Sequence, residues 1–158
     1  MTMPIATNHQ DRLLTINANE VPILTGTLGP GIDVQPLFLD QELGVWVIRA
    51  FFAPGVTLPK HYHTGSVYAW TIKGRWNYVE YPDQPQTAGS FLYEPGASVH
   101  TFQTPTSNTE TTEVFFVVFG ANVNFDDKGR LRLSMKAAAE DAAAPAPAPQ
   151  PSEPAPAA

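Results

Sequence analysis

The stretch LPKHYHTGSVYAW, residues 58–70, places His61 and His63 on alternate positions of a segment with β-strand character. Side chains at alternate positions of a strand point to the same face of its sheet. The two imidazoles can therefore converge on one point, and imidazole is a common ligand of divalent transition metals. The pair predicts a metal site on one face of a strand.

The chain around this stretch has the pattern of an all-β protein. Short runs rich in Val, Ile, Phe, Trp, Tyr and Thr are separated by Gly and Pro at roughly 8–12-residue intervals. Many short antiparallel strands in one domain predict a sandwich or small barrel. We expect strands over residues 32–40, 45–52, 67–74, 75–81, 89–95, 99–104, 113–120 and 122–135, the last with a hairpin turn at 126–129.

Composition narrows the classes of function. The chain has 158 residues, enough for one domain with its own core, and it has no cysteine, which excludes disulfides, thiolate metal sites and cysteine nucleophiles. The net charge is −6 and the basic residues do not cluster, which argues against nucleic acid or a membrane as partner. Without a signal-peptide pattern or a long apolar run, a cytoplasmic location is expected.

Three segments are expected along the chain. Residues 1–20 form an N-terminal arm in which His9 is exposed, and residues 21–135 form the β-barrel. Residues 136–158 consist almost entirely of Ala, Pro and acidic residues, which predicts a disordered tail because no large apolar side chain is present to be buried. The Ala-rich run also allows a short helix from Met135 to Ala144.

The spacing around the histidine pair matches a known motif. Gly55 lies six residues before His61, and Gly74 lies eleven residues after His63. The first sequence motif of the cupin family is a glycine, five residues, HxH, and then a glycine that closes the next strand. The chain resembles the cupins at this motif.

A third histidine fits the second cupin motif, which is a glycine, five residues, a proline and then a histidine. Gly89 lies six residues before Pro95, and His100 lies five residues after it. The resemblance covers roughly residues 32–120. It implies a jelly-roll barrel with a metal held inside by His61, His63 and His100.

This chain departs from the usual cupin motifs at several positions. The first motif normally has a glutamate three or four residues after HxH, where this chain has Val67 and Tyr68. The second motif normally has a second glycine and a final asparagine, where this chain has Ala97 and Thr104. The resemblance therefore implies three histidine ligands and open coordination positions, as in a catalytic site. Such ligands suit Fe(II), Zn, Ni or Cu.

A narrower resemblance indicates a reaction. The stretches PGVTLPKHYHTGSVYAWTIKGRWNYVEY and GSFLYEPGASVHTF resemble the 2,4'-dihydroxyacetophenone dioxygenase family, and GANVNFDDKGRL resembles that family and the related acetylacetone-cleaving dioxygenases. The resemblance implies an Fe(II) enzyme that uses O2 to cleave a C–C bond next to a carbonyl of a small ketone, giving two carboxylic products. Two alternatives remain: a metal-binding cupin sensor or binding module, and another cupin oxygenase such as a thiol dioxygenase.

Three charged residues are candidates for the site. In the acetylacetone-cleaving relatives a glutamate at the position of Glu94 lies beside the metal, which implies a base or distant ligand here; the alternative is a solvated turn carboxylate. Glu80 ranks lower and would be buried if its strand face points inward. Arg49, in the middle of a strand, either pairs with a buried carboxylate or faces solvent.

Aromatic side chains are the remaining candidates. Some are expected to line a substrate pocket, although most aromatics in a small barrel pack in the core. The candidates for the pocket, taken with Arg49, are Tyr68, Trp70, Trp76, Tyr78, Tyr93, Phe102 and Phe116.

An exposed β edge also leads us to expect a homo-oligomer, either a dimer or a tetramer.

Overall fold

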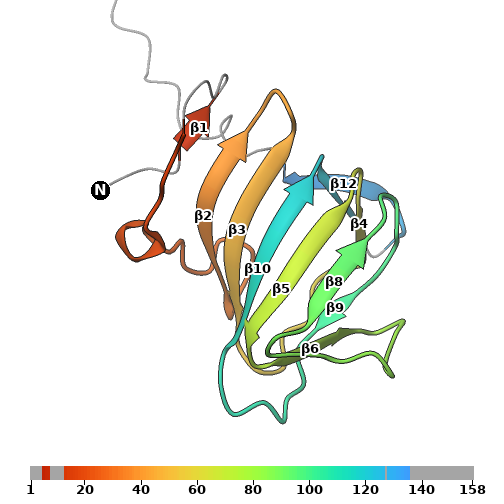
Figure 1. Ribbon diagram of the computed structural model, residues 1–158. Helices are drawn as coiled ribbons and strands as arrows, with labels where there is room; N and C mark the ends of the chain where they lie inside the picture. The colour runs from red at the N-terminus through yellow and green to blue at the C-terminus, as the bar shows by residue number, and fades with distance from the viewer. Residues whose placement is uncertain (1–4, 8–12, 127, 136–158) are drawn as a thin grey trace, which may run out of the picture.

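The computed structural model describes residues 5–7, 13–126 and 128–135, and these residues are almost entirely β-structure (Figure 1). One short 3-10 helix, η1, spans Ala18–Glu20. The strands are β1 (Ile5–Thr7), β2 (Ile32–Asp40), β3 (Val45–Phe52), β4 (His61–His63), β5 (Val67–Lys73), β6 (Arg75–Tyr78), β7 (Gln86–Thr87), β8 (Phe91–Glu94), β9 (Phe102–Gln103), β10 (Thr112–Phe119), β11 (Asn122–Phe125) and β12 (Leu131–Met135). The expected all-β fold is confirmed.

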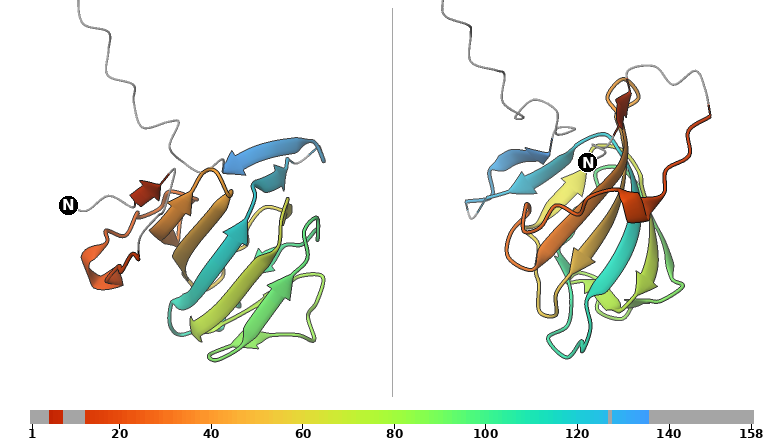
Figure 2. Two further views of the ribbon diagram at one scale, coloured as in Figure 1. Left: turned by 45° about the horizontal axis from the view of Figure 1, so that its top comes forward. Right: turned by 90° about the vertical axis from the view of Figure 1, so that its left-hand side faces the viewer.

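The strands form two facing layers. One is a six-stranded sheet in the order β1-β2-β3-β10-β5-β8, antiparallel throughout except for the parallel pair β1–β2. The other contains two three-stranded sheets, β12-β11-β4 and β7-β6-β9. Isolated bridges join these at His61–His100 and Thr57–Gln103. The side view in Figure 2 shows this second layer facing the inner side of the large sheet.

The core lies between the layers because the strands alternate apolar side chains inward. Along β3, Trp46, Ile48, Ala50 and Phe52 are buried, while the residues between them lie on the outer face. Fully burying such a large side chain contributes about 1.5–3 kcal/mol to the stability of the fold. This inner face of β3 also forms one wall of the site described below.

Several expected strands differ in extent from those observed. The strand expected over 75–81 ends at Tyr78, because the chain turns at residues 79 and 80, and the one expected over 99–104 is reduced to β9. The segment 122–135 divides into β11 and β12 around a turn in which the Asp126 carboxylate accepts the N–H groups of Lys128 and Arg130.

Some expectations fall on residues that the structure does not describe. His9 and the tail over 136–158 lie outside the described ranges, as does the helix expected from Met135, except for Met135 itself, which ends β12. Within the described ranges, no helix is long and apolar enough to cross a membrane.

Candidate metal centre

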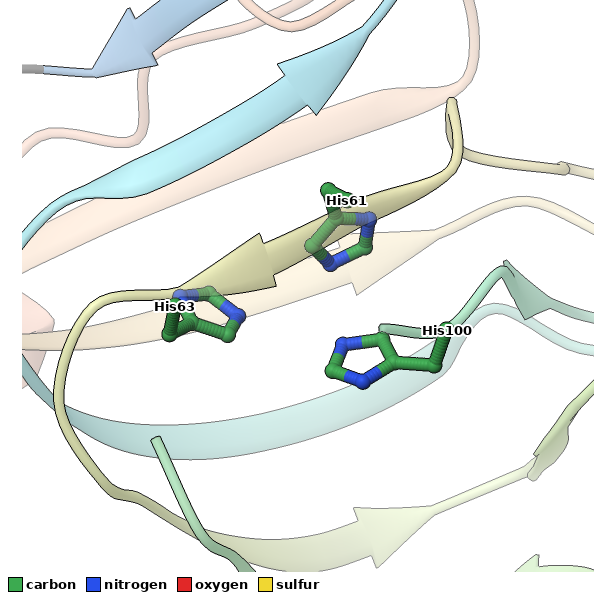
Figure 3. Close-up of side chains that lie close together, drawn as sticks. All are labelled: His61, His63 and His100. Carbon is green, nitrogen blue, oxygen red and sulfur yellow. The ribbon is translucent and has the colours of Figure 1, made fainter. Parts of the chain in front are cut away.

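Three histidine side chains meet inside the barrel (Figure 3). His61 and His63 lie at the two ends of β4 and project to the same side, as alternate strand positions do. His100 is placed beside them by two backbone hydrogen bonds with His61, of 3.0 and 2.9 Å. One nitrogen from each ring lies within 4.8 Å of the other two, so the group could hold a metal ion.

The protonation of the three rings suits metal binding. Nδ1–H of His61 donates to the Pro59 carbonyl over 2.7 Å, which leaves the lone pair of Nε2 free for a metal. Burial lowers the pKa of His61, and it lowers the pKa of His63 and of His100 to about 3. All three rings are therefore neutral at pH 7, and neutral imidazole is the form that ligates metals.

The site leaves buried polar atoms without hydrogen-bond partners among the described residues. These atoms are Nδ1 of His63, both ring nitrogens of His100, and Oε2 of Glu94. A buried polar group left unsatisfied costs about 1–3 kcal/mol. A metal at this point would satisfy the imidazole nitrogens that face it, so the residues present fit such an ion.

A carboxylic acid lies next to the histidines. Oε2 of Glu94 is 3.6 Å from Nε2 of His100 and 3.9 Å from Nε2 of His63, while Tyr78 donates its O–H to Oε1 and stacks on His100 with ring centroids 4.2 Å apart. Burial raises the pKa of Glu94 to about 8. At pH 7 the acid and both imidazoles are mostly neutral, so these distances do not represent ion pairs.

His61, His63 and Glu94 border a mainly apolar cavity of about 80 Å³ between the two layers, and His100 lies beside them. Its walls come from the inner faces of β3 and β10 and from the shorter strands opposite. Besides the site residues, the lining residues are Leu28, Trp46, Ile48, Ala50, Phe52, Leu58, Tyr78, Phe102, Phe116, Val118 and Asn122. Among these described residues there is no Lys or Arg, so the lining offers no cationic side chain to an anionic group of a ligand.

A second hollow of about 260 Å³ adjoins this cavity and shares Leu28, Leu58, His61 and Asn122 with it. Its further lining residues include Thr27 and Asn124, whose Oδ1 accepts the side-chain N–H of Asn122 over 3.2 Å. The lining that the two hollows share thus combines the amide of Asn122 with the apolar side chains of Leu28 and Leu58.

Comparison with known proteins identifies the family. The sequence profile of the ChrR cupin-like domain matches residues 12–123. The chain belongs to this family. The cupin membership predicted from the two histidine motifs is confirmed, while the narrower relation to the 2,4'-dihydroxyacetophenone dioxygenases stays a proposal.

Solved structures similar to this ChrR-like cupin have diverse functions. A cupin-like protein of unknown function from Ralstonia eutropha JMP134 is 48% identical, with 80% of this chain and 79% of that chain covered and a TM-score of 0.71. An acetylacetone dioxygenase from Acinetobacter johnsonii is 18% identical, with 83% of this chain and 89% of that chain covered and a TM-score of 0.63. ChrR bound to SigE from Rhodobacter sphaeroides is 17% identical, with 65% of this chain and 50% of that chain covered and a TM-score of 0.52. The last two likenesses show a shared fold alone. None of the curated proteins compared with this cupin matches it.

The cupin places the expected pocket aromatics in two different environments. Tyr78, Phe102 and Phe116 line the cavity, and Trp76 lies fully buried behind it, stacked on Phe102 with centroids 4.7 Å apart. The side chains of Tyr68, Trp70 and Tyr93 lie on the opposite, outer face of the large sheet. The expectation that these three line the pocket is wrong. The inward positions of β5 and β8 are the ones that alternate with these three residues, and they include Val67, Ala69 and Glu94.

Two charged candidates lie away from the cavity. Glu80 follows the end of β6, is exposed, and accepts the backbone N–H and the hydroxyl of Thr101 over 2.8 and 2.9 Å, so it supports the residue after His100 from outside. Arg49 projects from the outer face of β3 and donates to Glu113 over 2.9 and 2.5 Å. It also donates to Gln35 over 2.9 Å. Neither side chain contacts the histidines.

Sequence reasoning missed several lining residues of the cupin cavity. The alternation in VWVIRAFF carries a signal for Trp46 and Ile48, since it groups them on one face, but it does not show which face points inward. Leu28 lies in a glycine-rich loop without periodicity, and Asn122 begins a short strand. Neither of these positions carries a signal that links it to the histidines.

Proposed function

We propose that this cupin is a non-haem Fe(II)-dependent dioxygenase that uses O2 to cleave a C–C bond next to a carbonyl, in a 2,4'-dihydroxyacetophenone-like hydroxyketone or a β-diketone. The hydroxyketone would give two carboxylic products, whereas a β-diketone would give one carboxylic acid and one α-dicarbonyl compound, because one O2 supplies only two oxygen atoms. The observation that carries the proposal is the group of three neutral imidazoles with one buried carboxylic acid beside it. Two of these imidazoles and the acid line an apolar cavity whose described lining residues include no cationic side chain.

The three histidines would hold the iron, and each is prepared for this by its surroundings. The bond to Pro59 fixes the tautomer of His61, and burial keeps His63 and His100 unprotonated. When bound, Fe(II) supplies a Lewis acid for the carbonyl oxygen and a redox-active centre for O2. Three neutral ligands leave its full positive charge in place, which favours an enolate or another anionic bidentate oxygen ligand.

Glu94 is proposed as the base. Its Oε2 faces the histidines, and Tyr78 holds its other oxygen. Burial raises the pKa of Glu94 to about 8 in the metal-free site, and the positive charge of a bound metal would lower this pKa again, toward values at which the carboxylate can accept a proton. In the ionised form, Oε2 would take the acidic α-proton of the ketone and leave an enolate.

The cavity favours a ketone over a thiol that bears a carboxylate. The apolar side chains of Ile48, Phe102 and Phe116 would surround an aryl or alkyl group and exclude water. A substrate carboxylate that lies in the cavity away from the metal needs a positive partner, and the described lining residues offer none. The guanidinium of Arg49, on β3, lies on the other face of the sheet and is paired there with Glu113.

Oxygen uptake tests the proposal. The protein is loaded anaerobically with Fe(II) and offered 2,4'-dihydroxyacetophenone, acetylacetone or a small thiol, with Zn-, Ni- and Cu-loaded protein as controls. We expect one O2 consumed for each ketone cleaved, and label from ¹⁸O2 in both products, which are two carboxylic acids from the hydroxyketone and one carboxylic acid with one α-dicarbonyl compound from acetylacetone. Uptake with the thiol alone, or equal turnover with Zn, would refute the proposal.

A second candidate function is a metal-binding sensor or binding module, which the match to the ChrR cupin-like family favours. In that role the same three histidines would hold a metal, and the cavity would bind a small molecule without converting it. The two functions differ in one measurement: a sensor would bind a ketone to the Fe(II) protein, seen as a shift in melting temperature, with no uptake of oxygen.

A further inference from the structure

Six large apolar side chains are exposed together on the outer side of the six-stranded sheet. They project from β5, β8 and the end of β10, and each is between 38% and 57% exposed. We call this set the outer aromatic face; it consists of Tyr68, Trp70, Ile72, Phe91, Tyr93 and Phe119.

Strand register makes this face continuous. Tyr68 lies opposite Tyr93, and Trp70 lies opposite Phe91, with ring centroids 5.5 and 6.3 Å apart. Tyr68 also contacts Phe119, at 6.1 Å. Because the rings already hold one another in place, little side-chain entropy would be lost when another surface covers them.

On this outer side of the six-stranded sheet, the chain's own described residues cover β2 but not the outer aromatic face on β5 and β8. Over β2, the side chain of Gln35 is buried because it donates to the carbonyls of Ala18 and Val21, over 2.6 and 2.7 Å. Over β5 and β8, no described segment passes in front of the sheet (Figure 1). Between these two parts of the sheet, Arg49 and Glu113 neutralise each other.

The outer aromatic face is large for a surface that stays in water. Five half-exposed aromatic side chains offer on the order of 400–600 Å². The largest apolar patch of a typical monomer covers about 300–600 Å² and is often functional. A stable protein–protein interface needs about 800 Å² from each partner. Ile72 and the half-buried outer residues of β10 and β3 supply the remainder.

We infer that the outer aromatic face binds the same face of a second copy of this chain. A flat, apolar and uncharged surface is complementary to itself across a two-fold axis. Each chain carries a net charge of −6, so two copies repel unless they meet where acidic side chains are absent or paired, as they are here. The result is a face-to-face packing of two large sheets, a common arrangement of β-sheets.

Trp70 is a built-in probe of this interface. The chain has three tryptophans, of which Trp46 is 8% and Trp76 0% exposed, whereas Trp70 is 48% exposed. Quenching of tryptophan fluorescence by acrylamide therefore reports mainly on Trp70. We expect weak quenching at high protein concentration and several-fold stronger quenching on dilution, with a sedimentation mass falling from about twice the chain mass of 17.2 kDa toward that mass.

Charged substitutions locate the interface. Trp70→Glu combined with Phe91→Glu should give a monomer with an unchanged circular dichroism spectrum. The matched control is Tyr81→Glu, because Tyr81 is also 48% exposed but follows β6 in the other layer, and this variant should remain a dimer. All variants should retain the same metal content as the wild type, which separates this inference from the proposed function.

Three outcomes would overturn the inference. One is a wild-type protein that is monomeric at about 100 µM with Trp70 freely quenched. Another is a monomer in which Trp70 is protected, since a different segment of the same chain would then cover the face. The third is a dimer whose mass does not change in the double variant, which would place the contact elsewhere.

Discussion

Ala97 adopts a backbone conformation that favours glycine, next to the three-histidine group. Its φ is 63°, and its N–H donates to the carbonyl of His63 over 2.8 Å. A residue with a side chain loses about 1–2 kcal/mol of stability in the left-handed region, and glycine avoids this loss. Glycine also gives the unfolded chain more conformational entropy, which lowers the stability by about 0.4–1 kcal/mol. Ala97→Gly should therefore stabilise the protein by about 0.5–1 kcal/mol in urea unfolding. Ala53→Gly is the control and should destabilise; a loss of stability in Ala97→Gly as well would contradict this reading.

Glu94→Gln separates metal binding from catalysis. The amide keeps the shape of the side chain and can still accept from Tyr78, but it cannot take a proton. We expect an unchanged iron content and turnover lowered about 10²–10⁴-fold, the usual range for loss of a general base. Iron content and initial rates of oxygen uptake measure this. Full turnover in the Gln variant would show that Glu94 is not the base.

At the residue scale, the sequence allowed the histidines to be predicted but left the carboxylates open. The spacing of His61, His63 and His100 has meaning because strand alternation and two turns place them on one wall. The burial of Glu94 depends on the pairing of β5 with β8, which is a contact between distant segments. Glu80 appeared to share a face with Tyr78, but the strand ends between them.

At the scale of elements, Thr104 connects the loop before β4 to the segment after β9. Its hydroxyl donates to the carbonyl of Ala53 over 2.7 Å and accepts the N–H of Val56 over 2.9 Å. Thr104→Val leaves both backbone groups without this partner and should destabilise the protein by about 1–3 kcal/mol. Thr109→Val, at an exposed position, should change stability by less than about 0.5 kcal/mol. Equal unfolding midpoints for the two variants would contradict the assigned role of Thr104.

Strand interiors were predictable from the sequence, whereas strand ends and inward faces were not. The runs at 32–40 and 45–52 match β2 and β3, because runs rich in Val, Ile, Leu and Phe that are bounded by glycine and turn residues are a strong local signal. Both faces of β5 are apolar, so the sequence pattern does not indicate whether the face with Tyr68 and Trp70 points inward. That choice is made by the second layer, which covers one face of the large sheet.

For the whole molecule, the buried titratable groups predict how the stability of the metal-free protein depends on pH. His63 and His100 have a pKa of about 3 in the folded state against 6.5 ordinarily, so the unfolded state binds more protons between these values and stability falls as the pH drops below 6.5. Glu94 has a pKa of about 8 against 4.5, so the folded state holds the extra proton and stability falls as the pH rises toward 8.

These opposite slopes place the maximum contribution of the three groups near pH 6.5. Urea unfolding with a chelator present, at pH 5.5, 6.5 and 8.5, measures the profile. In the wild type, the free energy of unfolding should fall by about 1–2 kcal/mol between pH 6.5 and 8.5 because of Glu94, and this fall should be absent in Glu94→Gln. The fall in stability below pH 6.5 should persist in the variant. An identical profile in the two proteins would show that Glu94 does not carry a raised pKa.

The central claim is that one three-histidine group holds the iron at which the ketone is cleaved. The most direct test measures the iron content and ketone-dependent oxygen uptake of the same Fe(II)-loaded samples of wild type and His100→Ala, after circular dichroism has shown that both are folded. We predict about one iron per chain and turnover in the wild type, and the loss of both in the variant. A folded, iron-free His100→Ala protein that still cleaves the ketone would contradict the account.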